Sequence, residues 1–140
     1  MRNCQPVLLV EDDPADAGII QRALNELKIA NELVHKAGGR DALEYLRDEN
    51  SITPCVILLG LNMPWMNGFG FLETVKLDDA LKSIPVIILA ACDDDASVTR
   101  AFDLGAAGYI VKPTDYRQVV DAMRIVDRYW TMSRLPNGAV

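Results

Sequence analysis

The sequence predicts an α/β fold in which helices cover both faces of a parallel sheet. Short apolar runs alternate five times with segments whose apolar residues fall at helical spacing. Several of these runs are uninterrupted, as expected for strands of a parallel sheet that are buried on both faces. Alternating strands and helices imply right-handed crossovers, so the strands should lie parallel in one sheet.

Each expected element can be assigned to residues. The expected strands cover residues 7–10, 32–36, 56–59, 86–89 and 109–111. The helices between them are expected to bury Ile20, Ala23, Leu24 and Leu27; Ala42, Leu43 and Leu46; Phe71, Leu72 and Val75; Val98, Ala101 and Phe102; and Val119, Val120 and Met123. The second strand is polar enough for an edge, whereas the first, third and fourth read as central. This pattern favours the flavodoxin-like (βα)5 fold with strand order 2-1-3-4-5, whose ligands lie beyond the carboxyl ends of the strands.

Length and composition narrow the functional classes. With 140 residues the chain is expected to form one domain, residues 1–140, around one core. The formal net charge is −6 and no basic stripe occurs, so nucleic acid is not an expected partner. No apolar run approaches the length of a signal peptide or a membrane span, so no membrane partner is expected either. Three cysteines without metal-ligand spacing favour a reduced, cytoplasmic protein.

Charged residues gather where the expected strands end. Glu11 and Asp12 follow the first strand and Lys112 follows the fifth, whereas Gly60 and Ala90 lie at the ends of the third and fourth. Clustered carboxylates need a cation, a nearby lysine or solvent, and oxygen ligands suit Mg²⁺. A lysine can bind a phosphoryl oxygen or the carboxylates themselves. The strand ends therefore predict a pocket of the phosphate-and-metal type.

Three other polar residues near these strands receive simpler interpretations. Asp13 and Asp16 surround the start of the first helix, where acidic residues commonly cap the backbone, and we expect that role for both. His35 is the single histidine and has no partner at metal-ligand spacing, so it is expected on the surface.

Four segments, in this order and spacing, resemble the motifs of the CheY-like receiver domain of bacterial response regulators. They are LLVEDDPAD at 8–16, LNMPWMNGF at 61–69, IPVIIL at 84–89 and LGAAGYIVKP at 104–113, and the resemblance extends over nearly the whole chain. The tail VDRYWTMSRLP at 126–136 is similar to one subgroup, the stand-alone receivers paired with bacterial phytochromes and related sensor kinases. The resemblance implies a two-component signalling protein whose partner is a sensor histidine kinase, and a kinase of the phytochrome type is the specific expectation.

The resemblance also implies roles for individual residues. Glu11 and Asp12 match the acidic pair that holds magnesium, and Asn62 matches a position that supplies a backbone carbonyl ligand. Lys112 matches the lysine that contacts the phosphoryl group. Tyr109 matches an aromatic residue whose rotation accompanies activation.

Two positions depart from the family pattern. Gly60 stands where an aspartate would accept the phosphoryl group, and Ala90 stands where a Thr or Ser hydroxyl would bind it. Glycine supplies no oxygen nucleophile. We therefore expect a response regulator, not an enzyme, that acts by protein–protein binding through a degenerate acceptor site. Its magnesium site should be weakened, and Lys112 should pair with Glu11 or Asp12 and hold the pocket in one state.

Three alternatives remain open from the sequence. Another carboxylate, such as Asp12 or Asp13, could accept phosphate, which would make the chain an active phosphorelay carrier. Gly60 could also be a substitution in an ordinary Asp-phosphorylated regulator. A flavodoxin-like cofactor binder is a more remote alternative, because the loop after the first strand lacks the Gly, Ser and Thr residues that cradle a flavin phosphate.

The last helix carries a second apolar line beyond the one that faces the sheet. Ile125, Tyr129 and Met132 form this line, and Trp130 and Leu135 lie close to it. A helix with apolar residues on two faces usually buries both, and aromatic and Met side chains suit an interface core. We expect the segment from about 115 to 140 to form a homodimer, the alternative being that it folds back on its own domain. Because the sequence ends after this helix, no output domain is expected.

Overall fold

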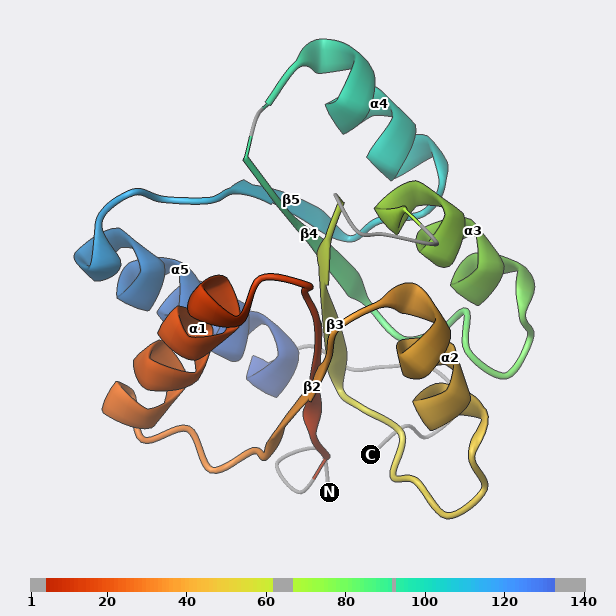
Figure 1. Cartoon of the computed structure of the whole chain (residues 1–140), viewed down its shortest axis with the longest axis horizontal. Helices are drawn as coiled ribbons and strands as arrows, with labels where there is room; N and C mark the ends of the chain where they lie inside the picture. Colours follow the sequence, from red (N-terminus) through yellow and green to blue (C-terminus); the bar gives the residue numbers. More distant parts are fainter. Residues whose placement is uncertain (1–4, 62–66, 92, 133–140) are drawn as a thin grey trace.

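The strand order of the sheet is the predicted one. The computed structural model describes residues 5–61, 67–91 and 93–132. Within these residues five parallel strands form one sheet in the order β2-β1-β3-β4-β5 (Figure 1). The strands are β1 (Val7–Val10), β2 (Leu33–Lys36), β3 (Val56–Gly60), β4 (Val86–Ala90) and β5 (Gly108–Val111).

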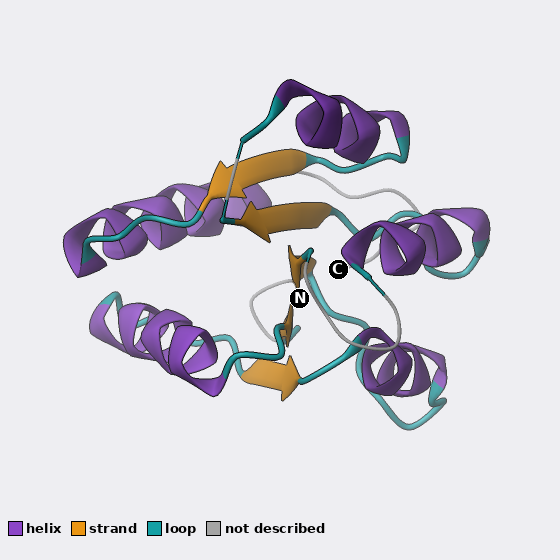
Figure 2. Ribbon diagram, turned by 45° about the horizontal axis from the view of Figure 1, so that its top comes forward, coloured by secondary structure: helices purple, strands orange, loops and turns teal. Residues whose placement is uncertain are grey.

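Helices lie on both faces of the sheet. They are α1 (Pro14–Glu26), α2 (Gly39–Arg47), α3 (Gly68–Leu77), α4 (Asp95–Asp103) and α5 (Tyr116–Met132). Helices α1 and α5 pack side by side on one face, and α2, α3 and α4 cover the other (Figures 1 and 2). In the part of the chain that the structure describes, no helix is both long and apolar enough to cross a membrane.

Successive residues of each central strand enter different cores. In β1, Leu8 and Val10 pack beneath α2 and α3, whereas Val7 and Leu9 pack beneath α1 and α5. Side chains alternate between the two faces of a strand, so a strand covered on both faces must be apolar throughout. All residues of β1, β3 and β4 are buried, whereas β2 is only partly covered at the edge of the sheet. The predicted division into central and edge strands is confirmed.

The third strand is one residue longer than predicted. Gly60 remains in the ladder, where it pairs with Leu89 of β4, and Ala90 pairs with Val111 of β5. Because the strands are parallel, their carboxyl ends reach the same edge of the sheet. Gly60 and Ala90 therefore lie beside the residues that follow β1 and β5.

Helix α4 buries less than its sequence pattern predicts. Ala101 is fully buried and Val98 is half-buried, but Phe102 is 49% exposed, so its predicted place in the core is wrong. The helical face that meets the molecule is centred on Ala101, and successive residues are about 100° apart around a helix. Phe102 consequently falls outside the buried stripe.

Candidate functional site at the carboxyl edge of the sheet

The carboxyl edge of the sheet contains a pocket of about 260 Å³, here called the edge pocket. It is lined by Glu11, Asp12, Asp13, Asp16, Gly60, Leu61, Leu89, Ala90, Ala91 and Lys112. Backbone hydrogen bonds fix its two charged sides: Glu11 N donates to Lys36 O at 3.0 Å, and Lys112 N donates to Ala90 O at 2.7 Å. The sheet thus brings together residues that lie about a hundred positions apart, as the sequence predicted.

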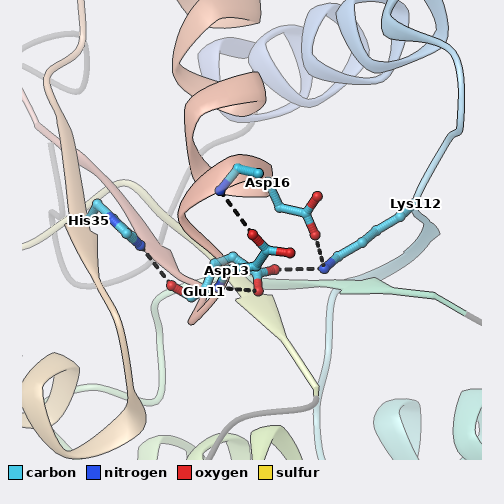
Figure 3. Close-up of polar contacts among 6 residues, drawn as sticks. Glu11, Asp13, Asp16, His35 and Lys112 are labelled. Atoms are coloured by element: carbon cyan, nitrogen blue, oxygen red, sulfur yellow. Dashed lines mark hydrogen bonds and ion pairs between the residues drawn. The ribbon is translucent and has the colours of Figure 1, made fainter.

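Lys112 is the electrostatic centre of this pocket. Its Nζ donates to Glu11 Oε1 at 2.7 Å and to Asp16 Oδ2 at 2.9 Å (Figure 3). Burial is the largest single effect on the pKa of Lys112 and acts to lower it. The hydrogen bonds and negative charges of the two carboxylates together outweigh burial and raise the pKa above its usual value. The predicted pairing of Lys112 with one of the first two acidic residues is confirmed for Glu11.

Glu11 is held from several directions. Its side chain is only 5% exposed, and its second carboxylate oxygen, Oε2, accepts a hydrogen bond from Asp13 N at 3.2 Å. Its backbone oxygen lies 2.7 Å from His35 Nε2 (Figure 3). His35 is exposed, as predicted, but its contact with the backbone of Glu11 was not foreseen, because strand register decides it.

The carboxylate of Glu11 lies against Gly60. A Cβ atom at residue 60 would come within 3.0 Å of Glu11 Oε1 and 3.4 Å of Glu11 Cδ. A side chain at residue 60 would therefore require the carboxylate that Lys112 binds to shift by a few tenths of an ångström. The missing side chain and the position of Glu11 are parts of one packing arrangement.

The two aspartates at the start of α1 have different roles. Asp13 is the N-cap, because its Oδ1 accepts from Ala15 N at 2.9 Å, which confirms its predicted role. Asp16 was also expected to act as a cap, and this prediction is wrong. Its carboxylate turns toward β5 and binds Lys112, because the first turn of α1 lies over the carboxyl edge of the sheet.

The remaining predicted site residues are placed as follows. Asp12 is exposed and lines the edge pocket, while Ala90 is 4% exposed and contributes no polar side-chain atom. Tyr109 is half-buried and packs against the core beneath α2, α3 and α4. Asn62 lies outside the described residues.

The side chains that the structure describes at this edge do not form a ready-made set of magnesium ligands. Mg²⁺ requires oxygen ligands in near-octahedral geometry. Among residues 5–61, 67–91 and 93–132, no group of three or more His, Cys, Asp or Glu side chains is arranged to hold a metal ion. Glu11 is already engaged by Lys112 and Asp13 N, and Gly60 offers no ligand atom from a side chain. Two of the carboxylates at this edge, those of Glu11 and Asp16, are paired with a lysine of the chain itself.

The fold and the residues at its carboxyl edge define a signalling receiver of the α/β type. Residues 7–124 match the response regulator receiver domain family, and the chain belongs to that family. Within the family it is similar to phytochrome response regulators. The crystal structure of the phosphorylated cyanobacterial phytochrome response regulator RcpA is 32% identical, with a TM-score of 0.87 over 96% of this chain and 99% of RcpA.

Two further relatives are similar to this chain over most of its length. Response regulator Rcp1 of Synechocystis is 30% identical over 128 residues, which cover 89% of this chain and 87% of Rcp1. A crystal structure of Rcp1 in its Mn²⁺-bound form has a TM-score of 0.84 and covers 94% of this chain and 99% of that one. The probable methanogenesis regulatory protein FilR2 of Methanothrix harundinacea is also 30% identical, over 89% of this chain and 82% of FilR2.

Proposed function

We propose that this response regulator signals by binding protein partners and does not depend on phosphorylation. The proposal rests on one observation: the lysine of the edge pocket is already bound by Glu11 and Asp16, and the adjoining strand ends at Gly60. A phosphoryl-accepting site needs an oxygen nucleophile, and a cation beside it stabilises the phosphoryl group. In this chain a glycine stands where the nucleophile would be, and the lysine is already paired with two carboxylates of the chain itself.

The same arrangement supports a weakened metal site. Rcp1 has been solved with Mn²⁺, so a relative of this chain binds a divalent cation. In this chain Lys112 competes for Glu11 with any such cation. We therefore propose that Mg²⁺ binds only weakly and is not needed for the resting conformation.

The expected partners are proteins. Similarity to phytochrome response regulators supports a sensor histidine kinase, and a phytochrome-type kinase is the specific proposal. The net charge of −6 disfavours nucleic acid, and the proposed activity is binding rather than catalysis. Membrane association is not part of the proposal.

A second copy of the chain is the other proposed partner. Helix α5 exposes Ile125 by 69% and Tyr129 by 49% on its outer face. Trp130 and Met132 lie on the same helix, but the described side chains end before them, and Leu135 lies outside the described residues. An apolar line on a helix that already buries its other face supports dimerisation through α5.

The decisive experiment is intact-mass analysis after incubation with acetyl phosphate and Mg²⁺, run beside a Gly60→Asp variant. We expect the variant to gain the mass of one phosphoryl group and the unsubstituted chain to gain none. If the unsubstituted chain is labelled, another carboxylate accepts phosphate and the proposal fails. Asp12, which is exposed at the edge pocket, is the first residue to substitute in that case.

Dimerisation has a separate test. Light scattering of the full chain at high micromolar concentration should give the mass of a dimer, and Ile125→Glu should give the mass of a monomer. Ile52→Glu is the matched control, because Ile52 is 61% exposed in the loop before β3. A monomer mass for the unsubstituted chain would contradict this proposal without affecting the one on phosphorylation.

A further inference from the structure

A second cavity, of about 170 Å³, lies between helices α1 and α5, here called the α1/α5 cavity. Its wall is mainly apolar and includes Leu9, Ile19, Ile20, Leu89, Ile110, Val119, Ala122 and Met123. Ile19 is 40% exposed and Thr114, which also lines the cavity, is exposed. The cavity can therefore be reached from solvent.

One end of this cavity is charged. Glu11, Asp16 and Lys112 line it, and all three also line the edge pocket. Two carboxylates and one ammonium group leave one net negative charge at this end. Asp16 binds Lys112 through Oδ2, and a carboxylate has lone pairs on both of its oxygens, so Asp16 can accept from a further donor.

The size of the cavity limits its ligand. An apolar cavity of about 150 Å³ is large enough for a benzene-sized molecule. The α1/α5 cavity is slightly larger and offers branched aliphatic side chains on three sides, from α1, β5 and α5. A compact hydrocarbon group of about six carbons fits this volume.

We propose that the α1/α5 cavity binds a small organic cation, namely a primary amine on a compact apolar body. The ammonium group donates to Asp16, and the hydrocarbon lies against Ile19, Ile110 and Met123. Charge complementarity decides the class of ligand, because an anion would meet a site of net negative charge, whereas an ammonium group adds a second donor to Asp16.

Such a ligand would act on the edge pocket through shared residues. An amine bound to Asp16 competes with Lys112 for this carboxylate, which changes how tightly Lys112 is held at the carboxyl edge. This inference goes beyond the proposed function, because it names a small molecule that would regulate the receiver in place of phosphorylation. It does not rest on the state of residue 60, so the amine titration and the acetyl phosphate experiment can fail separately.

The first test is a titration of the ¹⁵N-labelled full chain with cyclohexylammonium, followed by NMR, with cyclohexanol as the neutral match. We expect saturable shifts confined to the residues that line the cavity, in α1, α5 and the adjoining parts of β1, β4 and β5, with a dissociation constant of about 1 mM or tighter. The alcohol should bind at least about tenfold more weakly, because it lacks the charge. Shifts that do not saturate, or equal affinity for amine and alcohol, would overturn the proposal.

Variants locate the site. Ala122→Met should fill the cavity and abolish binding, while Ala96→Met, the same change at an exposed position of α4, should leave it unaltered. Asp16→Asn should weaken amine binding about tenfold, since it removes the net negative charge. Lys112→Met should tighten it, an outcome that simple structural damage would not produce.

Ala122 lies outside the ion-pair cluster, so Ala122→Met tests the cavity even if a change within the cluster prevents folding. Folding of each variant is checked by circular dichroism before titration. If folded Ala122→Met binds cyclohexylammonium as tightly as the unsubstituted chain, the α1/α5 cavity is not the site. If Lys112→Met weakens binding, the charge argument is wrong.

Discussion

The two halves of the carboxyl edge differ sharply in chemistry. On the side of β1 and β5, Glu11 and Lys112 form a short ion pair, and Asp16 joins it from α1. On the side of β3 and β4, the strands end at Gly60 and Ala90, neither of which has a polar side-chain atom. One half retains a charged cluster in close contact, and the other retains only the backbone that shapes the pocket.

This difference shows which parts of such a site depend on one another. A buried carboxylate is costly without its cation, so Glu11 and Lys112 must be kept or lost together. A residue that only adds a nucleophile or a hydroxyl group can be absent without leaving an unpaired charge. The Glu11 carboxylate that binds Lys112 lies beside Gly60, 3.0 Å from the position that a Cβ atom would take there.

Of the changes that test this difference, removal of the lysine should cost the most stability. Lys112→Met leaves the Glu11 carboxylate, whose side chain is 5% exposed, without its cation. We expect a loss of about 2–4 kcal/mol in the free energy of unfolding, less than for a fully buried pair because Lys112 is partly exposed to solvent. Urea denaturation measures it. Lys82→Met is the matched control: its partner Asp79 is 94% exposed, and the loss should be below about 0.5 kcal/mol. Equal losses in the two variants would show that the partly buried cluster contributes no more stability than an exposed ion pair.

A carboxylate at residue 60 tests the link between the two halves. In Gly60→Asp, the new side chain meets Glu11 at close range and adds a like charge, so we expect a loss of about 1–2 kcal/mol. The double variant Gly60→Asp/Glu11→Asp has a shorter neighbour beside residue 60. Its free energy of unfolding should be about 1 kcal/mol higher than the sum of the two single-variant effects predicts. Urea denaturation of both single variants and the double variant gives this coupling energy. Gly60→Ala, which adds the Cβ alone, separates crowding from charge. Additive effects would mean that Glu11 does not occupy the space of the missing side chain.

A smaller effect distinguishes the residues within the acidic half. Asp13→Ala should cost about 1 kcal/mol through loss of the α1 cap, whereas Asp13→Asn should keep the cap and cost little. Thermal unfolding of the two variants measures the difference. A loss for the Asn variant as large as that for the Ala variant would mean that Asp13 acts through its charge at the edge pocket.

The effect of pH on the stability that Lys112 contributes should be the smallest of these effects. The pKa of Lys112 is raised in the folded chain, so its contribution to stability is fully present below the unfolded lysine pKa of about 10.4. The contribution is lost as pH rises through the higher folded pKa. The stability difference between the unsubstituted chain and Lys112→Met should thus change by less than about 1 kcal/mol between pH 8 and pH 10, and shrink above that range. Urea denaturation across this series measures it, and a difference that grows above pH 10 would have the wrong sign for an ion pair.

The sequence predicted the architecture because its signals are local. The uninterrupted apolar runs at 7–10, 56–59 and 86–89 identify central parallel strands, since only a strand covered on both faces can be apolar throughout. The cap at Asp13 is also local, because the donor it satisfies lies two residues away. The absence of an acidic side chain at Gly60 needs no structure to be recognised.

Only the tertiary structure decided how the charged residues pair. Asp16 reaches Lys112 across 96 positions of the chain, and His35 reaches the backbone of Glu11 across 24, through the placement of α1 and the register of β2. The contact between Glu11 and Gly60, the exposure of Phe102 and the α1/α5 cavity likewise depend on how elements pack. Periodicity and capping follow from neighbours along the chain, whereas these contacts depend on distances between segments that packing alone brings together.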